Sequence, residues 1–130
     1  KFKKVISFEN NIEYFNKIKN IKPSNVDLIL FNKFGEPIFI ECKVCDRSKL
    51  LQSLRPHQKA FHHKYSKIMK GLFILQRDLS ARKVFLYRSQ ELNFLDEKNH
   101  AEPIAEDDFA SKWCAISAQL ENVPQHVGGQ

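Results

Sequence analysis

The sequence predicts one α/β domain in which helices flank a mixed β-sheet. Short runs of β-branched and aromatic residues alternate with segments whose apolar residues recur every three to four positions. The chain has 130 residues, enough for one domain with a modest core. Its composition, 42% hydrophobic and 28% charged, is typical of a globular protein. We expect residues 1–122 to form this domain and residues 123–130 to be a flexible tail.

The first predicted element is a helix near the N-terminus. In the segment SFENNIEYFNKIKN, the residues Phe8, Ile12, Phe15 and Ile18 lie near a period of 3.6 and would share one face. Ser7 is a suitable N-cap for this helix. The segment IKPSN then interrupts the pattern and predicts a loop.

Two strands, VDLILFN and PIFIECKV, are predicted to follow as a hairpin around the loop KFG. A three-residue loop with glycine at its last position is a common connection between antiparallel strands. If the pairing is centred on Phe34, Ile29 lies opposite Phe39 and Asp27 lies opposite Glu41. Directly opposed side chains in such a pair lie roughly 4.5–5.5 Å apart.

The segment SLRPHQKAFHHKYSKIMKG predicts a second helix. Proline is tolerated in a first helical turn, where Pro56 stands, and Gly71 is placed to end the helix. His62 and His63 are expected on the surface. The apolar positions at helical spacing are Leu54, Phe61, Tyr65 and Ile68.

Two further strands and a third helix complete the prediction. LFILQRD and KVFLYRS are the strands, with LSAR between them, and NFLDEKNHAEP reads as a loop. DDFASKWCAISAQLEN is predicted as a helix with Phe109, Trp113, Ile116 and Leu120 on one face. The expected order is therefore α-β-β-α-β-β-α.

Charge and cysteine content narrow the class of protein. The net charge of +6 favours a polyanionic partner, most simply nucleic acid. No apolar run approaches the roughly 20 residues of a membrane span, and the start KFKKVISFEN lacks the apolar stretch of a secretory signal. The sequence does not begin with Met, as expected if the natural start has been removed. Three cysteines do not form a disulfide framework and favour a reducing, intracellular setting.

The predicted hairpin concentrates ionic side chains on one face. Side chains alternate along a strand, so Glu41 and Lys43 share a face with Asp27. Two opposed carboxylates repel unless a cation lies between them. Mg²⁺ prefers oxygen ligands and is commonly held by one or two carboxylates with waters and substrate phosphate. The hairpin therefore predicts a divalent cation site with a lysine beside it.

This arrangement resembles the PD-(D/E)XK nuclease superfamily. The matching stretches are SNVDLIL and FIECKV, and the resemblance covers roughly residues 13–76. Asp27 and Glu41 match the two acids of the family and Lys43 matches its lysine, while Val26 stands where a proline often precedes the first acid. The resemblance implies a restriction-endonuclease-like αβββαβ core within the α/β fold. It also implies Mg²⁺- or Mn²⁺-dependent hydrolysis of phosphodiester bonds in DNA.

Two further positions resemble those of two branches of the superfamily, Holliday-junction resolvases and VRR-NUC nucleases, possibly of phage type. These branches place a glutamine early in the helix after the motif, which corresponds to Gln58 in LRPHQKAF. Resolvase-like members also carry a glutamate on the first helix, for which Glu13 is the candidate and Glu9 the alternative. The implied metal ligands are Asp27, Glu41 and the backbone carbonyl of Cys42. Lys43 would stabilise the attacking hydroxide and the charge that develops on phosphorus.

Basic residues near the predicted site in sequence are candidates for gripping phosphates in a sequence-independent manner. The resemblance implies a junction-resolving or other structure-specific endonuclease, and resolvases act as dimers. The helix that carries Trp113 is the candidate dimer face. The candidate nucleic-acid-binding residues are Arg47, Lys49, Arg55, His57 and Lys59.

Two alternatives remain open from the sequence. The first is a non-catalytic nucleic-acid-binding or assembly module that keeps a nuclease-like fold. The second is a zinc module, because Cys42, Cys45, His57 and His62 come close to the spacing of a zinc finger. No aromatic residue follows the second cysteine as expected for a finger, and a finger would leave the flanking strands and helices unexplained.

Overall fold

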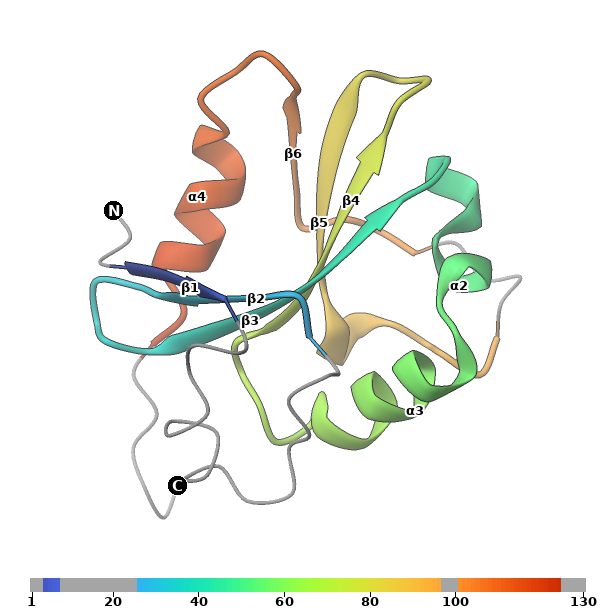
Figure 1. The fold of residues 1–130 in the computed structure, drawn as a ribbon, viewed down its shortest axis with the longest axis horizontal. Helices are drawn as coiled ribbons and strands as arrows, with labels where there is room; N and C mark the ends of the chain where they lie inside the picture. Colours follow the sequence, from blue (N-terminus) through green and yellow to red (C-terminus); the bar gives the residue numbers. More distant parts are fainter. Residues whose placement is uncertain (1–3, 8–25, 97–100, 125–130) are drawn as a thin grey trace.

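The computed structural model describes residues 26–96 and 101–124 in full and the backbone of residues 4–7. Among these residues, six strands form one mixed sheet in sequence order, β1-β2-β3-β4-β5-β6. Neighbouring strands are antiparallel except β3 and β4, which are parallel. Figure 1 shows the strong twist of this sheet and a helix on either side of it. The predicted α/β class with a mixed sheet flanked by helices is confirmed.

The predicted hairpin has the predicted register. Strands β2 (Leu28–Phe31) and β3 (Pro37–Val44) pair with Ile29 opposite Phe39. Gly35 in the turn has φ +77°, a backbone conformation that glycine adopts without strain. The apolar alternation and the short turn together fix this pairing. Strand β1 (Lys4–Ser7), which was not predicted, adds to the outer edge of β2.

Ser7, predicted as the N-cap of the first helix, is the last residue of strand β1. The rest of the predicted first helix, including Glu9 and Glu13, lies outside the described residues.

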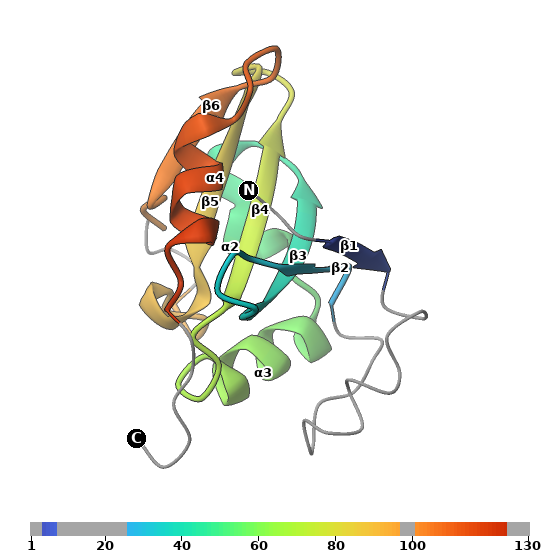
Figure 2. The ribbon, with the colours of Figure 1, turned by 90° about the vertical axis from the view of Figure 1, so that its left-hand side faces the viewer.

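The predicted second helix, over residues 53–71, is shorter than expected, and a separate helical turn that was not predicted precedes it. A 3-10 turn, η3 (Arg47–Lys49), leads into α2 (Leu50–Ser53), and α3 runs over Pro56–Tyr65 with the proline in its first turn as predicted. Because α3 ends at Tyr65, Ile68 is exposed and does not extend the apolar stripe. Figure 2 shows α3 beneath the sheet.

Gly71 has a different role from the predicted helix stop. It lies in the connection between α3 and β4, and its carbonyl accepts a hydrogen bond from the backbone N–H of Phe39. A Cβ atom at this position would lie 2.5 Å from the carbonyl oxygen of Pro37. Glycine therefore permits the close approach of this connection to β3.

The C-terminal part departs most from prediction. Strands β4 (Leu72–Asp78) and β5 (Lys83–Arg88) form as expected, followed by the turn η4 (Ser89–Glu91). The predicted last helix over residues 107–122 is wrong in its first half, since β6 (Ala105–Asp108) pairs with β5 and α4 begins at Cys114. Trp113 has a left-handed backbone conformation, with φ +53°, directly before α4, so the helix does not extend back through it.

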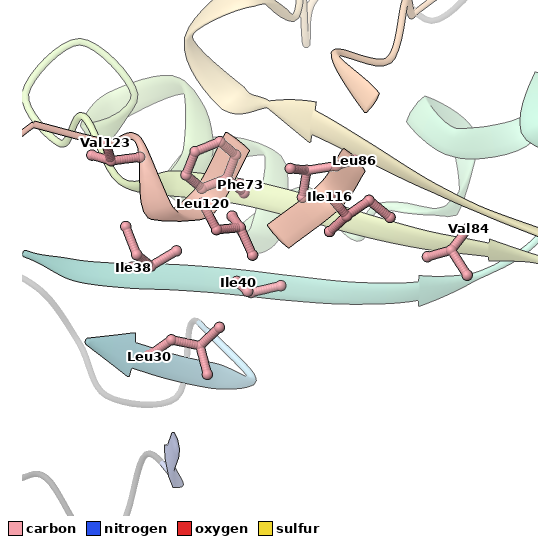
Figure 3. Packing of buried hydrophobic residues seen from close by; sticks show 9 residues of the cluster. All are labelled: Leu30, Ile38, Ile40, Phe73, Val84, Leu86, Ile116, Leu120 and Val123. Carbon is pink, nitrogen blue, oxygen red and sulfur yellow. The ribbon is translucent and has the colours of Figure 1, made fainter. Parts of the chain in front are cut away.

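The two faces of the sheet bury different clusters. Helix α4 covers an apolar cluster that includes Ile40, Phe73 and Leu86 (Figure 3). Val123, in the segment predicted as a tail, is buried in that cluster. The α2 and α3 side covers two clusters, one around Phe39 and Phe61 and one around the side chains of β4 and β5. No described helix is both long and apolar enough to cross a membrane.

Candidate active site

The two predicted acids meet where the β2–β3 ladder ends. Regular pairing stops at Leu28–Ile40, and the next residue, Asp27, donates its backbone N–H to the carbonyl of Ile40 at 3.0 Å. Oδ2 of Asp27 accepts a hydrogen bond from the backbone N–H of Cys42 at 2.7 Å. The side chains of Asp27 and Glu41 also share a hydrogen bond. The predicted juxtaposition of the two acids is therefore present, although Asp27 lies one residue beyond the ladder.

Glu41 has an unusual environment for an acid. Its side chain is buried, and burial, the hydrogen bond to Asp27 and the negative charge of Asp27 raise the pKa of Glu41 to about 8. The positive charge of Lys43 opposes this rise in pKa without cancelling it. At neutral pH the carboxyl pair therefore retains a proton. A divalent cation could replace that proton and allow both groups to ionise.

Lys43 and Gln58 connect β3 to the start of α3. The ammonium Nζ of Lys43 donates to Oε1 of Gln58 at 2.7 Å, and Nε2 of Gln58 donates to Oε2 of Glu41 at 3.3 Å. The same Oε1 accepts the backbone N–H of Arg55 at 2.9 Å, so Gln58 also caps its own helix. One glutamine thus fixes the acid, the lysine and the helix N-terminus relative to one another. Gln58 therefore faces the sheet and the acids, and His57 is exposed.

His62 is a buried residue of this site that the sequence interpretation placed wrongly on the surface. Its side chain has no exposed area, and Nε2 lies 3.6 Å from Oε1 of Glu41. On the other side of the ring, Nδ1 lies 2.7 Å from Oγ of Ser89. Burial and the charge of Lys43 lower the pKa of His62 to about 4. His62 follows Gln58 by four positions on one helix face, a spacing that could have indicated its place.

The oxygen atoms of the acid pair suit a hard cation. Two carboxyl groups in contact, one of them with an oxygen that has no hydrogen-bond partner, match the way proteins commonly hold Mg²⁺. The carbonyl of Cys42, the third implied ligand, lies between Glu41 and Lys43 in the same strand. The described residues contain no group of three or more His, Cys, Asp or Glu side chains arranged for a metal ion. Glu13, the remaining predicted acid, falls outside the described residues.

The predicted phosphate-gripping residues are distributed along η3 and the start of α3. Arg47 packs over the ring of Phe85 and pairs with Glu102 at 3.3 Å. Its backbone N–H donates to Oδ2 of Asp78 at 2.9 Å, which anchors the turn after β3. The set has four exposed members, Arg47, Lys49, Arg55 and His57, and Lys59 is half-buried. In sequence, His57 and Lys59 flank Gln58 at the start of α3, and Arg55 precedes Gln58 by three residues.

The four candidate zinc ligands do not form a common site. Sγ of Cys45 accepts a hydrogen bond from Nε2 of Gln76 at 3.2 Å, and His62 faces Glu41 and Ser89. Cys42 and His57 are exposed. The arrangement gives no support to the zinc alternative.

Comparisons of this chain with protein-family models, with curated proteins and with solved structures found no match. The functional argument therefore depends on the geometry of the site.

Proposed function

We propose that this protein is a metal-dependent nuclease of the PD-(D/E)XK type that hydrolyses phosphodiester bonds in DNA. The observation that carries the proposal is the contact between the carboxyl groups of Asp27 and Glu41, with Lys43 linked to Glu41 through Gln58. Further support comes from the order of the described elements. Within residues 13–76, the succession β2, β3, α3 and β4 matches the ββαβ part of the core that the resemblance implies, and β1 precedes this range.

Each residue has a role that follows from its position. Asp27 and Glu41 would hold Mg²⁺ or Mn²⁺, together with the carbonyl of Cys42. Such a cation supplies polarisation of the scissile phosphate and a lower pKa for a bound water. Lys43 places a positive charge beside the acids, where it stabilises negative charge that develops on the phosphoryl oxygens. Gln58 holds the Lys43 ammonium and the Glu41 carboxyl in one orientation, which reduces the reorganisation required during reaction.

The proposed substrate follows from charge and from the surroundings of the site. A net charge of +6 attracts the phosphate backbone, and Arg55 and His57 are exposed beside Gln58. Contacts to phosphates carry no sequence information, so we propose that DNA shape, as in a branched junction, determines substrate choice. A reducing intracellular setting is consistent with the three cysteines, all of which are free.

A homodimer through α4 and the preceding Trp113 stays a prediction. The side chain of Trp113 is half-buried against the chain's own α4-side cluster, and its Nε1–H donates to the carbonyl of Phe109.

The test is a Mg²⁺-dependent cleavage assay on duplex, single-stranded, flap and four-way-junction DNA. We expect Lys43→Ala to lower kcat by about 10²–10³-fold, because it removes the charge that stabilises the transition state. DNA affinity should change less than threefold, since one of many phosphate contacts is lost. Lys112→Ala is the matched control, because Lys112 is an exposed lysine outside the candidate active site.

Cleavage by Lys43→Ala at the wild-type rate would contradict the role assigned to Lys43. Tight DNA binding by the wild-type protein without cleavage of any of the four substrates would favour the non-catalytic binding module instead.

A further inference from the structure

A pair of buried polar atoms near the candidate active site has no hydrogen-bond partner. Nε2 of His62 and Oε1 of Glu41 both lack a partner, and they face each other at 3.6 Å. A buried polar group without a hydrogen bond costs about 1–3 kcal/mol. Two such groups that face each other indicate a hydrogen bond that is nearly formed in this structure.

The imidazole ring of His62 is held firmly from several elements. Phe61 packs edge-on at 5.6 Å between ring centroids, and Phe94 packs at 5.7 Å on another side. Nδ1 is fixed by Oγ of Ser89, which is itself fully buried at the start of η4. The ring therefore cannot turn away from Glu41 without loss of these contacts. A shift of a few tenths of an ångström would bring the 3.6 Å separation into the range of a hydrogen bond.

When Glu41 is ionised, as metal binding requires, hydrogen-bond chemistry leaves one arrangement that satisfies Glu41, His62 and Ser89. An ionised Glu41 carboxylate can only accept, so Nε2 of His62 must carry the proton. Nδ1 of the neutral ring must then accept a hydrogen bond, and the hydroxyl of Ser89 must donate it. Ser89 thus selects the tautomer of His62 that can bind the carboxylate. The neighbouring buried Gln76 differs, because its Oε1 and Nε2 both have partners at 2.6–3.2 Å.

We propose that His62 is a positioning residue that holds the Glu41 carboxylate through its Nε2–H, and that Ser89 fixes the tautomer required for this contact. This inference rests on the proposed function, since it assigns His62 a role toward the carboxylate that would bind the metal ion. It adds two residues to the site, from the middle of α3 and from the turn after β5. Partners of this kind, one step removed from the metal, commonly contribute 10–100-fold to metal affinity.

The affinity for Mg²⁺ alone, measured by calorimetry at pH 8, tests the proposal without any cleavage assay. We expect His62→Phe, which keeps a ring of similar size, to weaken the Kd for Mg²⁺ by about 10–100-fold. Ser89→Ala removes one hydrogen bond and should weaken it by about 2–10-fold. His63→Phe is the matched control because His63 is the adjacent, exposed histidine, and its Kd should equal that of the wild-type protein.

Nitrogen NMR of the Mg²⁺-saturated wild-type protein reads the tautomer directly. The proposal requires the Nε2–H form of His62, and a purely structural histidine would have no such requirement. The Nδ1–H form would overturn the proposal, as would a wild-type Kd for a folded Ser89→Ala protein. These two results decide the matter even if His62→Phe does not fold. If the wild-type protein itself did not bind Mg²⁺, the proposed function would fail and this inference with it.

Discussion

The two faces of the sheet differ in what they bury. The α4 face holds a continuous apolar cluster in which side chains of β2 to β5 pack against the helix. The α3 face also buries two apolar clusters, but with them it buries four polar side chains near the candidate active site, which are Glu41, His62, Gln76 and Ser89. Buried polar groups weaken a core unless they are fully hydrogen-bonded, so their concentration on one face indicates a purpose other than stability. We infer that the α4 face serves mainly the fold, while the α3 face carries the proposed active site.

A second contrast separates structural from functional polar groups. Asn32 is fully buried, and its side chain makes four hydrogen bonds, donating to the carbonyls of Leu120 and Val123 and accepting from the N–H groups of Phe34 and Glu36. Its partners tie the β2–β3 turn to the end of α4. Glu41 and His62 each leave one atom without a partner. Glu121, at the end of α4, also leaves one carboxylate oxygen unpaired, while its other oxygen accepts the N–H of Lys33.

The largest expected effect on stability comes from the apolar face. Phe73 has no exposed area and packs in the α4-side cluster (Figure 3). Phe73→Ala should lower the free energy of unfolding by about 3–5 kcal/mol through lost burial and the cavity left behind. Urea denaturation measures this, with the half-exposed Phe34→Ala as control. Equal losses for the two variants would contradict the assignment of Phe73 to the core.

A smaller loss is expected at the polar residue that serves the fold. Asn32→Ala should cost about 2–3 kcal/mol, because it leaves buried backbone groups without partners. The same urea experiment measures it, and cleavage per folded molecule should not change. A variant of normal stability that had lost cleavage would instead place Asn32 in the functional site.

Substitution of the buried acid Glu41 should raise the stability of the protein at high pH rather than lower it. The folded protein holds the Glu41 proton more tightly than the unfolded chain, because its pKa is about 8 rather than 4.5. The stability of the wild-type protein therefore falls as pH rises from about 4.5 to about 8. Glu41→Gln removes this dependence and should be more stable than wild type at pH 9, by on the order of 2 kcal/mol. It should nevertheless abolish Mg²⁺-dependent cleavage.

Thermal unfolding from pH 4 to pH 9 tests the Glu41→Gln prediction. His62 contributes the opposite slope, from pH 6.5 down to about 4, in both proteins. A wild-type stability curve parallel to that of the variant would show that Glu41 titrates normally.

Much of the hairpin and its ionic face could be predicted from the sequence. Alternation along β3 and the length of the turn determine which side chains share a face, and a shift of one residue would expose the apolar ones. These local rules placed Asp27, Glu41 and Lys43 on one face correctly. The same rules cannot detect the short edge strand β6, whose sequence AEDD has little strand propensity and which forms through pairing with β5.

The errors in the sequence interpretation have physical causes. The apolar spacing of Phe109, Trp113, Ile116 and Leu120 suggested one continuous helix. The left-handed backbone conformation of Trp113 prevents that helix, although all four side chains still pack in one cluster. His62 was assigned to the surface because histidine is polar. Its partners, Glu41 and Ser89, come from elements distant in sequence, so their approach depends on the sheet and could not be inferred from local pattern.

The most direct test of the account is the number of protons released when Mg²⁺ binds. Calorimetry in two buffers with different heats of ionisation gives this number at each pH. Because the pKa of Glu41 is raised to about 8, the account predicts release of close to one proton per bound ion at pH 6.5 and much less at pH 9. Mg²⁺ binding without proton release at pH 6.5 would contradict the claim that the ion occupies the shared site of Asp27 and Glu41.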